Sequence, residues 1–475
     1  MSHADAAALL DQLIREGRVE HGIPAVAYGL LHEGELVATG ASFDEGAPEV
    51  DATTRFRASS LTKSLTAATT LLLRDRRLLD LETPVAEILP WARVLSETFP
   101  GAPVRVRHLL EMASGLPTDD PWIDELDDLD EEGFEDLIAK GVTFSREPGT
   151  GYEYCNAGYA LAGRVISTVA GRDYREVVSE EILRPLGMTS SGFALPEASV
   201  RAQGHRVVGD DLMAVGDTAS GAFVPANGLW SCVLDMARWL ACLESAAAGV
   251  DGQPIPPHVA KELATPRRVT RLDRRRAGGE DIAVAHAYGL GLFSSTYSDV
   301  GRVVFHQGGC PGFGAEMRWH PQSRWGAIAM GNRSYAVLAP SVRRTLQGIV
   351  GPQIDALTAM EARRAMWPET IEAMDWAMDL LHRWDDDAFD EKASMVLDRQ
   401  LPRSTRRSLW EELAASRGPF TLDENSLRSA YPGHAHWRMV GANGDIWLEV
   451  LMSPESPPRV QLLTGSDIPG ATRVL

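Results

Sequence analysis

Apolar residues recur at helical spacing near the start of the chain, where residues 5–21 predict an amphipathic helix. Two short strand-like runs follow, at 24–31 and 35–40. Because only His32-Glu33-Gly34 separates these runs, they predict a β-hairpin. The first forty residues therefore predict a helix followed by two neighbouring strands.

The middle of the chain, from residue 121 to about 246, has mainly helical periodicity with irregular connections. Beyond it the pattern becomes short, β-rich and turn-separated, with predicted strands at 288–293, 303–305, 314–319 and 325–330. Such strands predict an antiparallel sheet, and a helix over about 340–350 is expected to pack back on it. Residues 1–352 thus predict an α/β domain of α+β type, with an antiparallel sheet flanked by helices and a helical subdomain.

The character of the chain changes again from Pro352. Four apolar residues then repeat at helical spacing, Ile371, Met374, Met378 and Leu381. A second helix is expected near 407–415, and strands are expected at 437–440, 446–452 and 460–463. About a hundred residues is a common domain size, so residues 353–475 predict a separate small α+β domain.

Composition and charge narrow the class of partner. Of the 475 residues, 44% are hydrophobic and 24% are charged, as in soluble globular proteins. The formal net charge of −20 argues against nucleic acid and against an anionic membrane, since both are polyanions. The arginines between residues 267 and 276 run against this trend, and we expect them to form a solvated surface loop.

Targeting segments and metal-ligand groupings are not visible in the sequence. The N-terminus lacks a basic region followed by an apolar one, and no run approaches the roughly 18 apolar residues of a membrane span. A cytoplasmic location is therefore expected. The cysteines are scattered without CxxC spacing, at positions 155, 232, 242 and 310. This pattern predicts neither a disulfide framework nor a metal site.

One stretch, residues 56–63, combines a nucleophile with a possible base. We expect a turn that leads into an apolar helix over 65–73, with Ser60 at the helix N-terminus and Lys63 one turn later. Residues three apart share a helical face, so the hydroxyl and the amine can meet. Lysine is rare in this chain, and unlike arginine a desolvated lysine can lose its proton. The alternative is that Ser60 only caps the helix and Lys63 is solvated.

A second motif, residues 152–159, contains the only Tyr-x-Asn of the chain, formed by Tyr154 and Asn156. A phenol held near a lysine can relay a proton, and an amide can orient an acyl group through its donor and acceptor. The alternative is a buried aromatic turn whose asparagine caps a helix. This motif therefore supplies a possible partner for the serine.

A third motif ends a predicted strand with His306, followed by Gly308 and Gly309. Glycine lets another backbone come close because it has no Cβ, so an N–H group here could serve as an oxyanion donor opposite that of Ser60. The pattern His-x-Gly is weak by itself, since residues 32–34 match it too. Its position after the other two motifs gives it weight.

In this order the three motifs resemble those of the serine β-lactamase and penicillin-recognising hydrolase family. The resemblance is closest to the class-C-like branch of esterases, D-aminopeptidases and penicillin-binding-protein-like hydrolases. It covers about residues 10–350 and includes further signatures at 108–117, 185–188, 228–231 and 288–291. It implies a β-lactamase/transpeptidase-like fold. The C-terminal segment resembles a cystatin-like α+β module that is found appended to hydrolases.

The resemblance implies a role for each motif residue. Ser60 would form an acyl-enzyme, Lys63 and Tyr154 would share general-base and general-acid work, and Asn156 would bind the acyl side-chain amide of the substrate. The N–H groups of Ser60 and Gly309 would form the oxyanion hole, with Gly308 and His306 beside it. Histidine stands here where β-lactamases and D,D-peptidases usually carry lysine. That departure removes a permanent cation for a substrate carboxylate and argues against β-lactam hydrolysis.

These residues lead us to expect a serine hydrolase that cleaves an ester, a small amide or a D-amino-acid peptide, without metal or organic cofactor. Three alternatives remain open: a transacylase that uses the same site, a β-lactamase or D,D-peptidase, and a non-catalytic binding protein on this fold. The expected partner is a small-molecule substrate, with neither nucleic acid nor membrane. The sequence makes no prediction of the oligomeric state.

Overall fold

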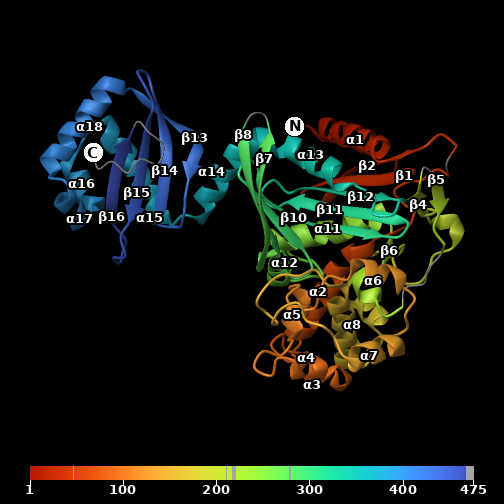
Figure 1. The fold of residues 1–475 in the computed structure, drawn as a ribbon. Helices are drawn as coiled ribbons and strands as arrows, with labels where there is room; N and C mark the ends of the chain where they lie inside the picture. Colours follow the sequence, from red (N-terminus) through yellow and green to blue (C-terminus); the bar gives the residue numbers. More distant parts are fainter. Residues whose placement is uncertain (47, 210, 217–220, 278–279, 467–475) are drawn as a thin grey trace. The chain divides into compact units, whose positions relative to one another are not determined.

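The computed structural model describes residues 1–46, 48–209, 211–216, 221–277 and 280–466 (Figure 1). The chain forms two compact units, Met1–Gly351 and Pro352–Leu475. The larger unit is built on an eight-stranded sheet and the smaller one on a four-stranded sheet. Across the described residues, no helix combines the length and the apolar character of a membrane span.

The eight strands of the larger sheet are all antiparallel and lie in the order β2-β1-β12-β11-β10-β9-β8-β7 (Figure 1). They are β1 Ala25–His32, β2 Glu35–Phe43, β7 Arg268–Ala277, β8 Glu280–Tyr288, β9 Phe293–Tyr297, β10 Gly301–Cys310, β11 Phe313–His320 and β12 Trp325–Gly331. Strands β7 to β12 are neighbours in chain order, whereas the hairpin β1–β2 joins at β12, where Val26 lies opposite Gly331. The expected antiparallel sheet and N-terminal hairpin are confirmed.

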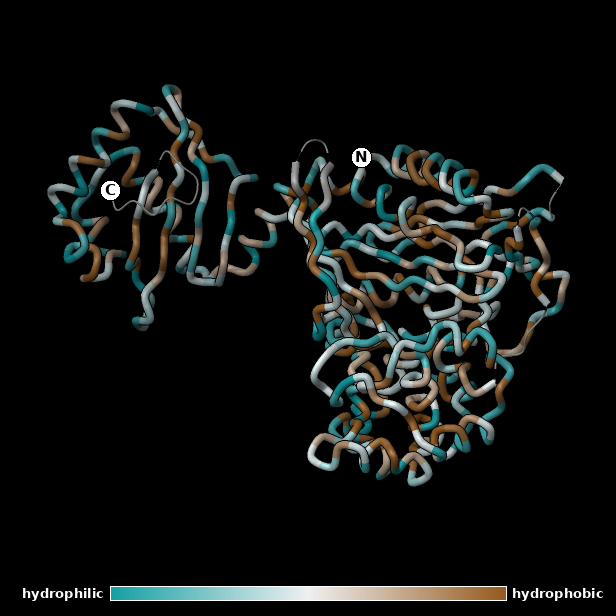
Figure 2. The backbone as a smooth tube through the Cα atoms, viewed as in Figure 1, coloured by the Kyte–Doolittle hydropathy of each residue, from teal (hydrophilic) through white to brown (hydrophobic). Residues whose placement is uncertain are grey.

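Helices cover both faces of this sheet, as expected. The long ones are α1 His3–Glu20, α11 Val233–Ala247 and α13 Ala339–Val350. Alternate residues of β1 point to opposite sides: Ala25 and Ala27 belong to the core that includes α11, whereas Tyr28 donates a hydrogen bond to Asp11 of α1. Helix α13 packs against α1. With both faces covered, strands β11 and β12 are buried along their whole length, and Figure 2 shows hydrophobic residues along the central strands.

A mainly helical region adjoins the sheet and surrounds helix α2 (Thr62–Asp75) (Figure 1). Its elements are η1 Ser59–Leu61, α3 Val85–Ile88, η2 Pro90–Ala92, α4 Val94–Glu97, α5 Val106–Leu110, α6 Asp120–Glu125, α7 Glu131–Lys140, α8 Asn156–Ala170, α9 Tyr174–Val178, η3 Ser179–Leu183, η4 Ala198–Val200, α10 Val224–Asn227 and α12 Pro257–Ala264. Two small antiparallel strand pairs complete it: β3 Phe56–Arg57 with β6 Trp230–Ser231, and β4 His205–Val208 with β5 Asp211–Ala214.

Helix α2 is buried on all sides from residue 62 to residue 73. Most of its hydroxyl groups find a hydrogen-bond partner in this apolar environment, although the buried Thr69 Oγ1 has none. Thr66 Oγ1 lies 2.7 Å from the Tyr174 hydroxyl, and the Trp239 indole donates to Ser64 Oγ at 2.9 Å. Small and hydroxyl-bearing residues thus let neighbouring elements pack tightly around the helix that carries the predicted nucleophile and base.

The run 288–293 is not the single strand that the sequence predicted. Strand β8 ends at Tyr288 and β9 begins at Phe293, and between them Gly291 has a φ of +75°. A Cβ atom at this glycine would lie 2.7 Å from the Lys63 carbonyl oxygen. The segment is therefore a turn that packs its backbone directly on the first turn of α2, a close approach that only glycine permits.

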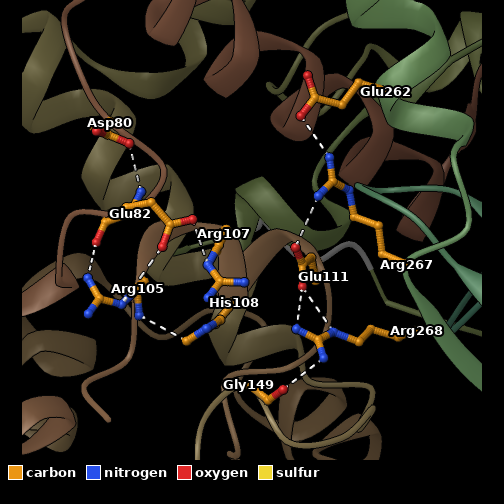
Figure 3. Close-up of polar contacts among 10 residues, drawn as sticks. All are labelled: Asp80, Glu82, Arg105, Arg107, His108, Glu111, Gly149, Glu262, Arg267 and Arg268. Atoms are coloured by element: carbon orange, nitrogen blue, oxygen red, sulfur yellow. Dashed lines mark hydrogen bonds and ion pairs between the residues drawn. The ribbon is translucent and has the colours of Figure 1, made fainter. Parts of the chain in front are cut away.

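The arginines at 267–276 do not form the solvated loop that we expected. Most of this stretch is strand β7, and Arg268 donates to Glu111 Oε2 from both Nε (3.0 Å) and Nη2 (2.7 Å). Arg268 also donates to the Gly149 carbonyl at 2.7 Å, and Arg267 pairs with Glu111 and Glu262. Figure 3 shows these side chains converging on Glu111, which is 3% exposed. The two arginines join the sheet edge to the helical region.

The smaller unit has strands in the order β13-β14-β15-β16, all antiparallel. Its elements are β13 Phe420–Arg428, β14 His434–Gly441, β15 Ile446–Met452, β16 Val460–Ser466, α14 Ile354–Ala365, α15 Pro368–His382, α16 Asp386–Lys392, α17 Met395–Gln400 and α18 Arg403–Arg417, and the short turn η5 Gly351–Gln353 precedes them. Helix α15 packs on β14 and β15. Strand β13 had no sequence signal, because Asp423 and Glu424 interrupt its apolar pattern.

Candidate active site

Ser60 lies in the short 3₁₀ turn that precedes α2, as the sequence predicted. The residue before it, Ser59, has a φ of +50°, a left-handed backbone conformation that residues other than glycine rarely adopt. Thr62 holds the turn, because its hydroxyl donates to the Ser59 carbonyl at 2.6 Å. Ser60 is 8% exposed and lines a cavity. A strained turn therefore presents this one hydroxyl to the cavity.

Lys63 is completely buried beneath Ser60. Its Nζ atom donates to Ser60 Oγ at 3.0 Å, to Asn156 Oδ1 at 2.7 Å and to the Ala226 carbonyl at 2.9 Å. Burial lowers the pKa of Lys63 to about 7, although the negative charges of Asp120 and Asp119 act in the opposite direction. A lysine with this pKa can be neutral near neutral pH and can then accept a proton from the serine.

Tyr154 lies beside the serine. Its phenol is close enough to interact with Ser60, and its ring centre lies 5.0 Å from Lys63 Nζ. Its ring stacks on Phe293 with a centroid distance of 6.3 Å. Burial raises the pKa of Tyr154 well above 10. The phenol therefore keeps its proton and is suited to donate or relay one, whereas Lys63 is better suited to act as the base.

Asn156 begins α8 and is 2% exposed, and its side chain does not line the cavity. Its Oδ1 accepts from Lys63, and its Nδ2 donates to Asp119 Oδ1 at 3.0 Å and Asp120 Oδ1 at 2.8 Å. Both ends of the amide are thus occupied by protein groups. This arrangement suits a residue that positions the lysine. The substrate contact expected for Asn156 would require the amide to give up its hydrogen bonds to Lys63 or to the two aspartates.

Asp119 and Asp120 belong to the site although the sequence interpretation did not select them. Asp119 accepts hydrogen bonds from the backbone N–H groups of Asn156 at 2.7 Å and Ala157 at 2.8 Å. It therefore caps α8, whose N-cap Cys155 makes no side-chain cap. Asp120 lines the cavity. Their only sequence signal was their position directly after the signature at 108–117.

Strand β10 supplies the opposite wall of the site through His306, Gly308 and Gly309. Burial, together with the nearby charge of Lys63, lowers the pKa of His306 to about 3. The imidazole is therefore neutral, and its Nδ1 lies 2.7 Å from the Gln307 carbonyl. A neutral ring cannot replace the permanent cation that lysine would provide.

The two glycines allow close approaches in two directions. A Cβ at Gly308 would lie 2.4 Å from the Ala58 carbonyl oxygen, in the turn before Ser60. A Cβ at Gly309 would lie 2.4 Å from the ring of Tyr335. Strand β10 thus lies against the serine turn at Gly308, which is the proximity that an oxyanion hole between these two segments requires.

The cavity has a volume of about 450 Å³. Five of the seven predicted site residues line it, namely Ser60, Tyr154, His306, Gly308 and Gly309, whereas Lys63 and Asn156 lie buried behind Ser60. The rest of its lining is mainly apolar and aromatic, together with the carboxylates of Asp120 and Glu316 and the amide of Gln307. Within the described ranges, no group of three or more His, Cys, Asp or Glu side chains is arranged to hold a metal ion.

Two solved structures resemble the chain. The octameric penicillin-binding protein homologue from Pyrococcus abyssi has a TM-score of 0.61 at 19% identity and is matched over 96% of this chain and 95% of that one. A D-stereospecific amidohydrolase from Streptomyces sp. has a TM-score of 0.56 at 22% identity, over 71% of this chain and 97% of that one. At these identities the likeness shows a common fold, and it confirms the β-lactamase/transpeptidase-like architecture.

Sequence relatives point the same way. The unguisins hydrolase ungD of Aspergillus violaceofuscus is 25% identical over 66% of this chain and 59% of its own length. Penicillin-binding protein 4 of Amycolatopsis lactamdurans is 28% identical over 39% of this chain and 48% of its own length. The chain thus spans only about half of these relatives. The family model described as Beta-lactamase matches residues 10–349, and the chain therefore belongs to the β-lactamase family of hydrolases.

Proposed function

We propose that the protein is a serine hydrolase that cleaves an ester, a small amide or a D-amino-acid peptide through an acyl-enzyme on Ser60. The observation that carries this proposal is the 3.0 Å contact between Ser60 Oγ and the buried amine of Lys63. A serine hydroxyl becomes an effective nucleophile when an adjacent group takes its proton. A pKa of about 7 for Lys63 allows that transfer near neutral pH.

The reaction begins when neutral Lys63 accepts the hydroxyl proton and Ser60 Oγ bonds to the substrate carbonyl carbon. The carbonyl oxygen becomes an oxyanion, which the N–H groups of Ser60 and Gly309 receive. Collapse of this intermediate breaks the bond to the leaving group, which takes a proton through the Tyr154 phenol. Water then attacks the acyl-enzyme with the same groups in reversed roles, releasing the acid and restoring the serine hydroxyl.

The charges around the cavity favour substrates that carry an amino group over substrates that carry a carboxylate beside the reacting bond. His306 is neutral, and Asp120 places a carboxylate in the wall. A substrate amino group near Asp120 would be attracted to that carboxylate. The carboxylate of a β-lactam would instead find no cation at position 306, where β-lactamases usually carry lysine. These observations support esters and amino-bearing amides, with D-amino-acid peptides among them, above β-lactams. A transacylase would use the same residues and differ only in the acceptor that replaces water.

The test is intact-protein mass after reaction with a fluorophosphonate probe and, separately, with an activated ester, for the native protein and for Ser60→Ala. A single adduct on the native protein that is absent from the variant is the expected result. Product analysis with added amine or alcohol acceptors then separates hydrolysis from acyl transfer. A folded native protein that forms no adduct with either reagent would contradict the proposal and favour a binding role.

A further inference from the structure

A second cavity, of about 410 Å³, adjoins the catalytic one. The two cavities share four lining residues, Tyr152, Phe293, Gln307 and Ala339. We name the second one the arginine cavity, because its charged lining is provided by Arg271 on β7, Arg318 on β11 and Arg343 on α13. The catalytic cavity is lined by a neutral histidine and by the carboxylates of Asp120 and Glu316, so the two adjoining spaces differ in charge.

Arg318 carries a hydrogen-bonding group that the protein leaves unused. The residue is 3% exposed; its Nε donates to Glu316 Oε1 at 2.7 Å, and its guanidinium carbon lies 4.1 Å above the Phe305 ring centre. Its Nη1 atom is buried and has no hydrogen-bond partner. An unpaired buried donor costs free energy, and an acceptor that enters the cavity would remove that cost.

Arg343 repeats this feature on the helix that borders the same cavity. Its Nε atom is also buried without a hydrogen-bond partner, and its charge acts on Glu316, the carboxylate that pairs with Arg318. The two arginines line the same cavity, each with a nitrogen left without an acceptor, and Glu316 Oε2 beside Arg318 is likewise left without a donor. Guanidinium groups in such an arrangement match the two oxygens of a carboxylate.

The surrounding charges leave the arginine cavity cationic. Among the described residues, three arginines line the cavity, at positions 271, 318 and 343. Two carboxylates form ion pairs with them: Asp273 with Arg271, and Glu316 with Arg318. Asp273 is occupied by Arg271 at 2.7 Å and by His286 at 3.2 Å. The pKa of His286 is lowered by burial and by the charges of Arg271 and Arg318, so the ring adds no further charge. An anion entering here meets an excess of positive charge.

We propose that the arginine cavity is an anion subsite that binds a carboxylate located at the end of the substrate remote from the reacting carbonyl. This proposal rests on the proposed hydrolase function, because the subsite acts on the same bound substrate. Because the two cavities share part of their lining, one molecule that reaches both would place its carbonyl at Ser60 and its carboxylate between Arg318 and Arg343. The preferred substrates are then esters or amides that end in a free carboxylate, such as short peptides.

The test uses 4-nitrophenyl esters of succinic, glutaric and adipic acids, each with its far carboxyl group either free or blocked as a methyl ester. A mirrored series carries a free or blocked carboxyl group on the phenol. The measured quantity is the ratio of kcat/KM for the free ester to that for the blocked ester. In the native protein we expect this ratio to exceed one for at least one length. In Arg343→Gln it should fall about tenfold, the size of one charge-assisted hydrogen bond.

Arg344→Gln is the matched control, because Arg344 is the exposed neighbour of Arg343 on the same helix. It removes the same charge from the surface and should keep the native ratio. A native ratio near one in both series, or an equal fall in the two variants, would overturn the anion subsite while the proposed hydrolase function stands. If no ester reacts at Ser60, the hydrolase function fails instead. Calorimetric binding of monomethyl glutarate to the native protein and to Arg343→Gln then decides the subsite alone: tighter binding to the native protein supports it, and equal or absent binding overturns it.

Discussion

Lys63 Nζ lies 3.0 Å from Ser60 Oγ. The contact follows from their spacing, because the two residues are three positions apart at the start of a buried helix and so share one helical face. The lysine has no access to water. Its hydrogen bonds to Asn156 and Ala226 fix the amine beneath the serine. The relationship makes the protonation state of Lys63 the quantity that controls nucleophilic attack.

Replacing Lys63 by arginine keeps a positive charge but removes a group that can become neutral. We expect Lys63→Arg to lower the rate of acylation by about 10²–10⁴, the usual contribution of a general base. The measurement is the rate of adduct formation with an activated ester. Lys140→Arg makes the same substitution at an exposed position and should react at the native rate. Equal rates for both variants would exclude the lysine as the base.

The pH dependence of acylation follows from the lowered pKa of Lys63. Below a pH of about 7 the amine is protonated and cannot accept the serine proton, and above it the amine is neutral. The value of kcat/KM should therefore rise with pH and level off, with an inflection near pH 7. A profile measured on a neutral ester from pH 5 to 9 tests this expectation. An inflection near 10, where an ordinary lysine titrates, would contradict the effect of burial.

Asp120 should tune both the lysine and the substrate preference. Its negative charge raises the pKa of Lys63, so Asp120→Asn should move the inflection of the acylation profile to lower pH. The same variant should weaken the preference for amino-bearing substrates over neutral ones, because the cavity loses one of its two carboxylates. Asp128→Asn removes an equal charge at an exposed position. If both variants shift the profile alike, long-range charge and not contact explains the effect.

The sequence predicted the parts of the site that local pattern encodes. The spacing of Ser60 and Lys63 on one helix is a local property, and so is the pair of glycines at the end of β10. The interaction of Asp119 with α8 is not local, because it joins residues 37 and 38 positions apart through the folded chain. No periodicity marks such a cap, so nothing in the local pattern selected Asp119 or its neighbour Asp120.

Two misassigned segments show the same limit for the fold. Residues 288–293 are apolar enough to predict a strand, yet Gly291 turns there because α2 lies against it. The arginines from 267 onward are polar enough to predict a loop, yet they form β7, whose pairing with β8 satisfies the backbone. In both segments tertiary contacts outweigh the local pattern.

Gly308 should tolerate no side chain. A Cβ there would lie 2.4 Å from the Ala58 carbonyl oxygen, which belongs to the backbone and cannot rotate away. We expect Gly308→Ala to lower the free energy of unfolding by about 1–3 kcal/mol, as overpacked sites do, and to slow acylation by moving β10 away from the serine turn. Gly101→Ala is the control, because nothing lies within 4 Å of a Cβ at that position. Urea unfolding and adduct rates measure both effects.

Glu111 should stabilise the larger unit through its ion pairs with Arg267 and Arg268, at the start of the edge strand β7. It is 3% exposed and accepts two hydrogen bonds from Arg268, so Glu111→Gln leaves that guanidinium partly buried without its counter-charge. We expect the free energy of unfolding in urea to fall by about 1–3 kcal/mol, since removing one partner of a buried pair exposes the desolvation cost of the other. Glu97→Gln makes the same change in a pair that is mostly exposed, with Arg93 at 3.6 Å, and should cost less than about 0.5 kcal/mol. Equal losses in the two variants would contradict this prediction, because they would show that Arg268 finds water or another acceptor in Glu111→Gln. The contact of Arg268 with the Gly149 carbonyl would then be sufficient to hold the sheet edge to the helical region.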